Sequence, residues 1–438
     1  MSATFTSPDP RRSLFVLLFL VLAGLSSCTD ECETTTTYTI QEPIQISRAA
    51  MIGAVESQPA RKLTATGKIY TKDHLVFVNE PYRGIHVIDN QNPATPQPLA
   101  FINIPGNVDM AIRDNILFAD AGPDLLALDI TDPRRAVVKK HVFNTFQTNF
   151  NWNAGTATAS AGALTDNIQV GFNTRLVTTT RECESEPVNV FFDMGGIAIG
   201  QSASFADARS AGGSTGTGGS MARFTISGNY LYAINPNVMR VFDISSPADP
   251  QAGNLVQMGN GIETVFPYQD KLFIGSMSGM LIYDIRDGAQ PAYLGGYSHI
   301  TRCDPVVVSG NYAYVTLRSN PGGMCGAGNS NQLDVVDISN PRAPQLKRTF
   351  PMQHPYGLGI DRNTLFVCEG DYGLKVFDAQ DPLVVGNKQL AHFQHINLFD
   401  VIPLGNTLLA VGSDGLYQYD YADVKNIRFL SKIPVSKP

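Results

Sequence analysis

Six polar side chains occupy similar positions in the sequence. Each lies six or seven residues before an Asn or Asp that begins an apolar run. They are Asp109, Arg223, Glu263, Asp304, Tyr356 and Asp400. If the fold gathers them, four carboxylates and one guanidinium form an acidic ring suited to a cation, an amine or a sugar. Two of the carboxylates at a suitable separation would also serve glycoside hydrolysis. The plainer interpretation is that these positions are polar because they face water.

The rest of the sequence adds no catalytic motif to this set. It contains no Gly-x-Ser-x-Gly, no His-Glu-x-x-His and no regular calcium loop. The run "GTGGS" lacks the Lys of a phosphate-binding loop. Lys and Arg do not cluster and the net charge is −7, so nucleic acid is not expected as a partner. We therefore expect no catalytic residues, no metal site and no cofactor.

A second repeated feature, an apolar run that ends in Asp, indicates the elements that would position the ring. The seven aspartates are Asp89, Asp129, Asp243, Asp284, Asp337, Asp378 and Asp420. Most neighbouring pairs are 40 to 42 residues apart, and the two longer intervals, of 114 and 53 residues, contain insertions. A period near 41 residues, with four short apolar runs in each copy, matches a blade of a β-propeller.

Seven such copies predict an all-β fold, a seven-bladed β-propeller of four-stranded antiparallel blades. One four-stranded sheet cannot bury both of its faces, whereas each sheet in a closed ring is covered by two neighbours. The innermost strand of every blade then begins at one mouth of a central channel, where the six polar residues would meet. The seven aspartates lie where a third strand turns, and a carboxylate there caps turn N–H groups, so we assign them a structural role.

The N-terminus predicts export. Arg11 and Arg12 precede the apolar run "SLFVLLFLVLAGL", which has the length of a signal peptide and is short for a membrane span. The next residues, "LSSC", resemble the lipobox of bacterial lipoproteins, in which the Cys, here Cys28, carries the diacylglycerol. The alternative is an ordinary secretory signal followed by a chance Cys. The expected parts are a lipoprotein signal peptide at 1–27, an acidic, Thr-rich tether and N-terminal segment at 28–63, and the propeller at 64–438.

Residues 144–220 form an insertion between the second and third blades, expected on the rim of the ring. Its small polar stretches cannot pack a core, and "NIQVGF" and "VNVFFDMGGIAIG" could pair as an extra hairpin. We favour a mobile loop over a recognition loop carrying Trp152, because no polar constellation accompanies that Trp. The segment Tyr38–Ser47 could add an outer strand to a blade.

The cysteines allow one disulfide prediction. Six occur, and lipidation of Cys28 leaves five, an odd count. Cys303 and Cys325 would lie at the same end of the fifth blade, and outside the cytosol a disulfide between them is permitted. Cys368 is a competing partner, and a zinc site that adds His354 ranks below the disulfide.

The repeated runs also resemble a known family. The segments "LVFVNEPYRGIHVID", "LDVVDISNP" and "GLKVFDAQDP" look like LVIVD repeats, and the likeness extends from Gly67 to Val435 apart from the insertion. The arrangement is similar to that of Bacteroidetes LVIVD lipoproteins, and "TDECE" after Cys28 resembles the export signal of their surface lipoproteins. This resemblance implies a propeller with an interaction role at the cell surface, and it supplies no catalytic residues.

These features together predict a non-catalytic outer-membrane lipoprotein, exposed at the cell surface or alternatively facing the periplasm. Its partners would be the membrane, through Cys28, and a protein or glycan ligand bound by one face of the ring. We expect the chain to be a monomer. The alternative function is an extracellular enzyme that processes glycan or peptide with acidic residues at the channel mouth. The sequence does not identify the ligand.

Overall fold

The computed structural model describes residues 33–146, 167–182, 215–259, 261–299, 305–319 and 331–436. The chain forms two units, one of residues 1–42 with 174–196 and one of residues 43–173 with 197–438. Several predictions therefore fall outside the described residues, namely the signal peptide, Cys28, Trp152, Cys303, Asp304, Cys325 and the segment "VNVFFDMGGIAIG". Among the described helices, none is both long and apolar enough to cross a membrane.

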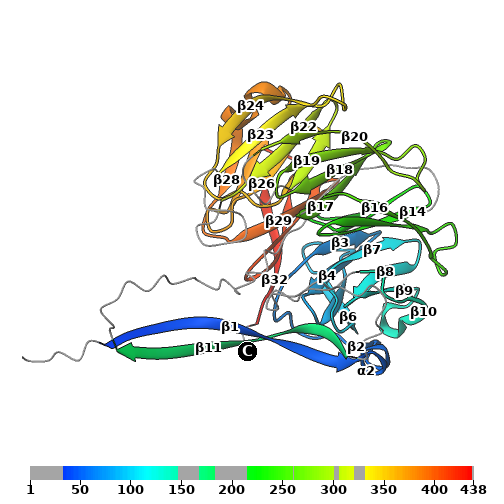
Figure 1. Cartoon of the computed structure of the whole chain (residues 1–438). Helices are drawn as coiled ribbons and strands as arrows, with labels where there is room; N and C mark the ends of the chain where they lie inside the picture. The colour runs from blue at the N-terminus through cyan, green and yellow to red at the C-terminus, as the bar shows by residue number, and fades with distance from the viewer. Residues whose placement is uncertain are drawn as a thin grey trace, which may run out of the picture. The chain divides into compact units, whose positions relative to one another are not determined.

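The larger unit confirms the predicted fold, a ring of seven blades with four antiparallel strands each (Figure 1). Blade 1 consists of β3 (Ile69–Lys72), β4 (Leu75–Glu80), β5 (Gly84–Asp89) and β6 (Gln97–Asn103). Blade 2 consists of β7 (Met110–Arg113), β8 (Ile116–Ala121), β9 (Asp124–Asp129) and β10 (Val137–Val142). Blade 3 consists of β13 (Phe224–Ser227), β14 (Tyr230–Asn235), β15 (Val238–Asp243) and β16 (Gln251–Gln257).

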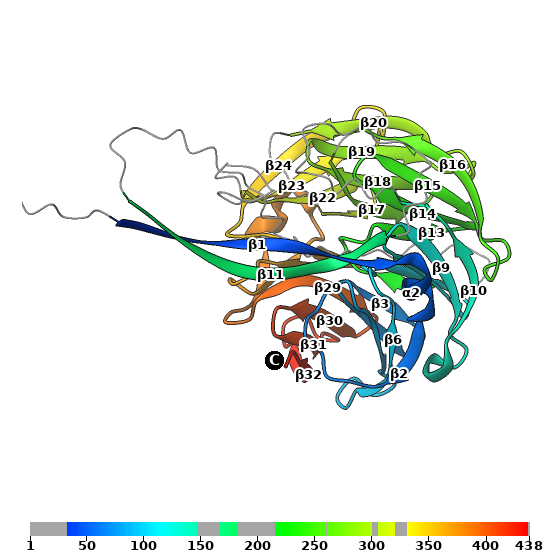
Figure 2. The ribbon, with the colours of Figure 1, turned by 60° about the horizontal axis from the view of Figure 1, so that its bottom comes forward.

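The other four blades follow in chain order around the ring (Figure 2). Blade 4 consists of β17 (Ile262–Tyr268), β18 (Lys271–Ser276), β19 (Gly279–Asp284) and β20 (Ala292–Ser298). Blade 5 consists of β21 (Val306–Ser309), β22 (Tyr312–Leu317), β23 (Gln332–Asp337) and β24 (Gln345–Pro351). Blade 6 consists of β25 (Leu358–Asp361), β26 (Thr364–Cys368), β27 (Leu374–Asp378) and β28 (Gln389–Phe393). Blade 7 consists of β29 (Leu398–Leu404), β30 (Thr407–Gly412), β31 (Gly415–Asp420) and β32 (Arg428–Pro434).

Burial within a blade follows the position of the strand. All six residues of β8 are buried, because its sheet is covered on both faces by neighbouring blades. The fourth strands are the most exposed, and in β16 six of the seven residues are exposed. Apolar residues therefore occur at both parities in the inner strands, and the core lies between blades.

The seven repeated aspartates each end the third strand of a blade. In every case the carboxylate accepts a hydrogen bond of 2.8 to 3.0 Å from the backbone N–H two residues later. This bond closes the turn that leads into the fourth strand, where the backbone N–H has no ladder partner. The geometry is that of a turn cap at Asp89, Asp129, Asp243, Asp284, Asp337, Asp378 and Asp420.

The ring closes between blades 1 and 7, and each of these blades is built from consecutive strands of the chain. Leu63 and Val435 form an isolated parallel bridge, and the Ser436 N–H donates to the Leu63 carbonyl at 2.8 Å. The Asn90 and Gln418 side-chain amides exchange hydrogen bonds of 2.9 and 2.6 Å across the seam. The seam is therefore held by side-chain and terminal-backbone contacts.

The N-terminal segment contains two strands and a helix from residue 33 onward. Its strand β1 (Glu33–Ser47) pairs with β11 (Asn167–Glu182), and its helix α2 (Arg48–Gly53) buries Met51 against blades 1 and 2. The expectation that Tyr38–Ser47 adds an outer strand was wrong, because β2 (Glu56–Pro59) holds that position beside β6. The segment "NIQVGF", which begins β11 and lies far away along the chain, helps to form the partner strand of β1 instead.

Two short 3₁₀ helices, η1 (Pro133–Arg135) and η2 (Pro382–Asn387), replace the usual turn before the fourth strand in blades 2 and 6. Each is preceded by an N-cap Asp, Asp132 or Asp381, whose carboxylate accepts the backbone N–H of Arg134 or Leu383 respectively. In the smaller unit, the described residues form a paired ribbon in which Thr side chains face each other across the strands. Thr37 and Thr178 have their hydroxyl oxygens 3.1 Å apart.

Candidate functional site

The end of the insertion runs into the centre of the ring, which differs from the expected place on the rim. Residues 215–223, called here the channel segment, contain β12 (Thr217–Gly218), which pairs with β3, the innermost strand of blade 1. The segment also bonds to other blades: Gly216 N–H donates to the blade 2 carbonyl of Ile112, and blade 4 donates to the Ala222 carbonyl. The channel segment therefore covers the inner ends of several blades.

The channel segment changes the role of Asp109, one of the predicted mouth residues, because it lies over this residue. Asp109 is only 1% exposed, and its carboxylate accepts the backbone N–H groups of Met110 and of Arg223 in the channel segment. Lys68 lies beside it, with its Nζ 3.7 Å from the Asp109 carboxylate and bonded to the carbonyl of Met221. Burial lowers the pKa of Lys68 to about 8, although the neighbouring Asp109 opposes that effect. Asp109 thus fixes the channel segment in place.

Asp400 is also enclosed, with no exposed surface. It lies in β29 of blade 7, near the hydroxyl of Ser220, which itself accepts a 2.8 Å hydrogen bond from the Leu358 N–H of blade 6. Burial raises the pKa of Asp400 well above its ordinary value, against the effects of the Val401 N–H, the Lys68 charge and the Ser220 hydroxyl. The Asp400 carboxyl is therefore enclosed by the described part of the protein.

Two further predicted residues, Tyr356 and Glu263, both interact with Arg318. Tyr356 precedes β25, and the guanidinium carbon of Arg318 lies 3.6 Å from the centre of its ring. The ring of His354 contacts Tyr356 edge-on at 5.0 Å. Glu263 lies in β17 and interacts electrostatically with Arg318. Asp304, the sixth predicted residue, lies outside the described residues, so the acidic ring as a whole stays a prediction.

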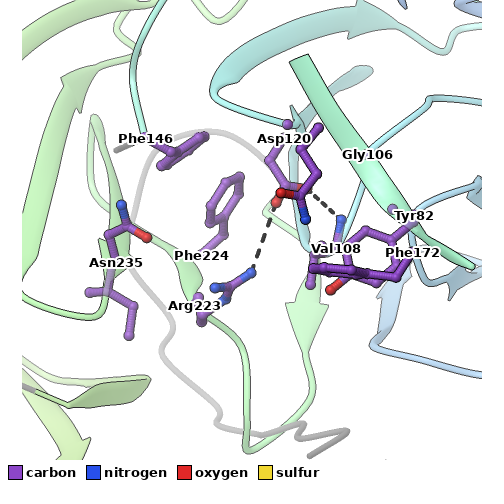
Figure 3. Close-up of a pocket in the computed structure, with 13 residues that line it drawn as sticks. Tyr82, Gly106, Val108, Asp120, Phe146, Phe172, Arg223, Phe224 and Asn235 are labelled. Atoms are coloured by element: carbon purple, nitrogen blue, oxygen red, sulfur yellow. Dashed lines mark hydrogen bonds and ion pairs between the residues drawn. The ribbon is translucent and has the colours of Figure 1, made fainter. Parts of the chain in front are cut away.

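An open hollow lies where the ends of blades 1, 2 and 3 meet (Figure 3). Its empty space, including the part open to solvent, is about 630 Å³. The lining comes from the ends of β8 and β14, the first half of β11, the start of β13 and the connections between strands. It consists of Tyr82, Gly106, Val108, Asp120, Gly122, Phe146, Gln169, Gly171, Phe172, Arg223, Phe224, Ile234 and Asn235. All of these residues belong to the larger unit.

Asp120 forms the polar centre of this hollow. Its Oδ1 accepts three hydrogen bonds, from the Asn107 amide at 2.8 Å, the Val108 N–H at 2.7 Å and the Asp109 N–H at 2.9 Å. Its Oδ2 lies 3.9 Å from Nη2 of Arg223, which is beyond hydrogen-bond distance. One carboxylate oxygen is therefore fixed by the protein, and the other is directed toward the guanidinium.

Two aromatic pairs form the walls on either side of Asp120 (Figure 3). Phe146 stacks on Phe224 with ring centres 5.3 Å apart, and Tyr82 meets Phe172 edge-on at 5.9 Å. Tyr82 has a positive φ of 66°, which turns its ring toward the hollow from the β4–β5 connection. The backbone segments at Gly106 and Gly122 also lie close together in the lining. A Cβ atom on Gly106 would come within 2.6 Å of the Gly122 nitrogen.

The electrostatics of the hollow follow from burial next to a single cation. Burial raises the pKa of Asp120 to about 6, although the Arg223 charge and the Asp109 and Val108 N–H groups oppose this. Burial also raises the pKa of Tyr82, and the charges of Arg223 and Asp120 act on that phenol in opposite directions. The phenol, the carboxylate and the guanidinium therefore lie within electrostatic reach of one another.

The sequence interpretation missed most of this site. Arg223 was identified, but Asp120, Tyr82 and Phe172 were not, because they lie at second-strand ends, in a turn and in the insertion. Lys68 was also missed, although it precedes β3 as Asp109 precedes β7. Lys68 lies five residues before Asp73, so the six- or seven-residue spacing of the other repeats does not reach it.

The described part of the chain holds no group of three or more His, Cys, Asp or Glu residues arranged for a metal ion. Cys368 is a free, buried thiol in β26, and burial raises its pKa well above the ordinary value. The proposed partners Cys303 and Cys325 lie outside the described residues, so their disulfide stays a prediction.

Comparisons with known proteins support the repeat. Residues 218–254, 302–321 and 324–351 match the LVIVD repeat, and these matches lie in and beside blades 3 and 5. A search of curated proteins finds no match.

Solved structures with a similar course of the chain have little sequence in common with it. A functionally unknown protein from Desulfotomaculum acetoxidans is 12% identical, with a TM-score of 0.49 over 82% of this chain and 95% of its own. The computationally designed protein Ika8 is 12% identical, with a TM-score of 0.48 over 86% and 90%. Hsv2p from Kluyveromyces lactis is 10% identical, with a TM-score of 0.43 over 87% and 98%.

Proposed function

We propose that this propeller with LVIVD repeats is a non-catalytic binding protein of the cell envelope, anchored by lipid at Cys28, that holds a glycan or a protein at the hollow of blades 1 to 3. The observation that carries the binding role is the hollow itself. It combines a buried carboxylate, a guanidinium and a phenol with two aromatic pairs on a scaffold of paired strands. Concave sites with a few convergent polar groups among aromatic side chains are typical of ligand binding.

The arrangement of carboxylates favours binding over glycoside hydrolysis. That reaction needs two carboxyl groups that both reach the scissile bond. Asp120 is the single carboxylate among the described residues that line the hollow. Two of the four acids expected at the mouth, Asp109 and Asp400, are 1% and 0% exposed. Within the described lining of the hollow, Asp120 therefore has no second carboxylate to act with it on a substrate.

The anchor is supported by sequence. A basic start, an apolar run and "LSSC" precede Cys28, and two or three acyl chains on such a Cys would hold the chain on a membrane. We propose the outer membrane as its location and its outer face as the side on which the propeller is displayed. The acidic run after Cys28 supports this placement by its resemblance to an export signal.

The anchor is tested by metabolic labelling with an alkyne fatty acid in a bacterial host that processes lipoproteins. The wild-type chain should take up label and sediment with membranes, and Cys28→Ser should lose both properties. Cys32→Ser is the matched control, because it removes a thiol four residues away and should leave labelling unchanged. Label that persists in Cys28→Ser would overturn the anchor. Protease added to intact cells then distinguishes surface display from a periplasmic orientation.

The binding role is tested with the full chain, purified in a detergent without a sugar head group, on immobilised glycans and peptides. Bound material is recovered and its mass is compared with that of the starting material. Recovery of intact ligand supports a binding protein. Cleaved ligand supports the enzyme alternative and overturns the non-catalytic proposal.

A further inference from the structure

We infer that the hollow of blades 1 to 3 takes a neutral sugar ring at the end of a glycan, held between Asp120 and Arg223 and stacked on the aromatic walls. This inference rests on the proposed binding function and names the class of its ligand.

The first argument is the unused hydrogen-bonding geometry at Asp120. Its Oδ1 is saturated by three donors from the protein, whereas its Oδ2 lies 3.9 Å from Nη2 of Arg223. A hydroxyl group is both a donor and an acceptor. Placed in this gap, a hydroxyl donates to the carboxylate and accepts from the guanidinium, and two adjacent hydroxyls can divide these roles. A sugar presents such pairs of neighbouring hydroxyls around its ring.

The second argument is charge. Asp120 and Arg223 are the charged residues among the described lining of the hollow, and their charges are opposite. An anionic ligand near Arg223 also meets the carboxylate, and a cationic ligand near Asp120 also meets the guanidinium. Taking a charged ligand out of water is costly unless a partner is available for it alone. A neutral polyol avoids this cost and still uses both groups.

The third argument is the shape and chemistry of the walls. The Phe146–Phe224 pair and the Tyr82–Phe172 pair lie on either side of Asp120 (Figure 3). A pyranose ring has C–H groups on its faces and hydroxyls around its edge, so its faces suit the aromatic rings while its edge meets the polar centre. Part of the hollow is open to solvent, which leaves room for the rest of the glycan to continue outward.

The test uses the full chain in sugar-free detergent on an array of three oligosaccharide classes. Neutral chains end in glucose, galactose, mannose or xylose, acidic chains end in a uronic acid, and cationic chains end in glucosamine. Asp120→Asn and Phe172→Ala are compared with wild type, and circular dichroism verifies that each variant is folded. Asp73→Asn and Tyr293→Ala are matched controls, since both side chains are more than half exposed and neither lines the hollow.

We expect neutral oligosaccharides to bind, Asp120→Asn and Phe172→Ala each to weaken binding by about tenfold or more, and the controls to bind as wild type does. Preference for acidic or cationic chains would overturn the inference. So would neutral binding that neither site variant weakens, because the sugar would then lie elsewhere. Absence of any glycan binding by the folded chain also overturns it. In that case the proposed function is judged separately, by the peptide arm and the lipid-anchor experiment.

Discussion

The buried carboxyl of Asp120 should make the protein less stable as the pH rises from about 4 to about 6. Burial raises the pKa of Asp120 from 3.8 to about 6 in the folded chain. Between these values the folded state holds a proton that the unfolded state has released. Stability therefore falls with rising pH in this window, and the full cost of the buried charge is present above pH 6.

The size of the effect follows from the difference in pKa. A difference of about two corresponds to about 3 kcal/mol, at about 1.4 kcal/mol for each tenfold change in the proton equilibrium. Asp120→Asn removes the charge and keeps an Oδ1 that can accept from Asn107, Val108 and Asp109. The variant should therefore match wild type at pH 4 and exceed its free energy of unfolding by up to about 3 kcal/mol at pH 7.5.

The assay is urea unfolding of the two chains at pH 4, 5, 6 and 7.5, followed by circular dichroism. The quantity of interest is the difference between variant and wild type at each pH, because other groups titrate equally in both. Tyr293→Ala is the control, since it removes no carboxyl group and its side chain is 56% exposed, so its difference from wild type should not depend on pH in this range. A flat difference for Asp120→Asn, or one that grows toward low pH, would refute the assignment of Asp120 as a desolvated acid.

Three further predictions concern the scaffold. Burial acts to raise the pKa of Glu80, but hydrogen bonds and charges from neighbouring side chains overcome this effect and lower the pKa to about 2. Glu80→Gln should therefore lose about 3 kcal/mol of unfolding free energy above pH 4.5, and progressively less as the pH falls toward 2. Urea unfolding checks this, with Glu56→Gln, at an exposed position, as a control that should not change. Asp89→Ala should cost about 1 kcal/mol of unfolding free energy while Asp89→Asn costs less, because only Asn keeps an acceptor for the turn; equal losses would contradict the cap. Ser220→Ala should cost about 1–3 kcal/mol of unfolding free energy, because it leaves the buried Leu358 N–H of blade 6 without its acceptor. Hydrogen exchange at the Leu358 amide should become faster, and unchanged exchange would contradict the role of the channel segment.

The seven-bladed ring could be predicted from sequence because its signals are local. Each copy carries a turn residue, an apolar run and a closing Asp within about 41 residues, and the hydrogen bond of that Asp spans only two residues, as at Asp89 and Asp420. A sheet that repeats in this way can bury both faces only by stacking on copies of itself, so the period implied the ring.

The functional geometry depended on contacts between distant residues that have no periodic signal. The channel segment pairs for only two residues, Thr217 and Gly218, and its Gly- and Ser-rich sequence reads as a loop. Its placement buries Asp109 and Asp400, which equal spacing alone had put at an open mouth. The partner of β1 lies more than 100 residues away along the chain in β11, whose base brings Phe172 to the hollow. Sequence thus determined which strands form and how many blades they make. Burial decides whether a carboxylate faces solvent, a lysine or a ligand, and it is a property of the assembled ring alone.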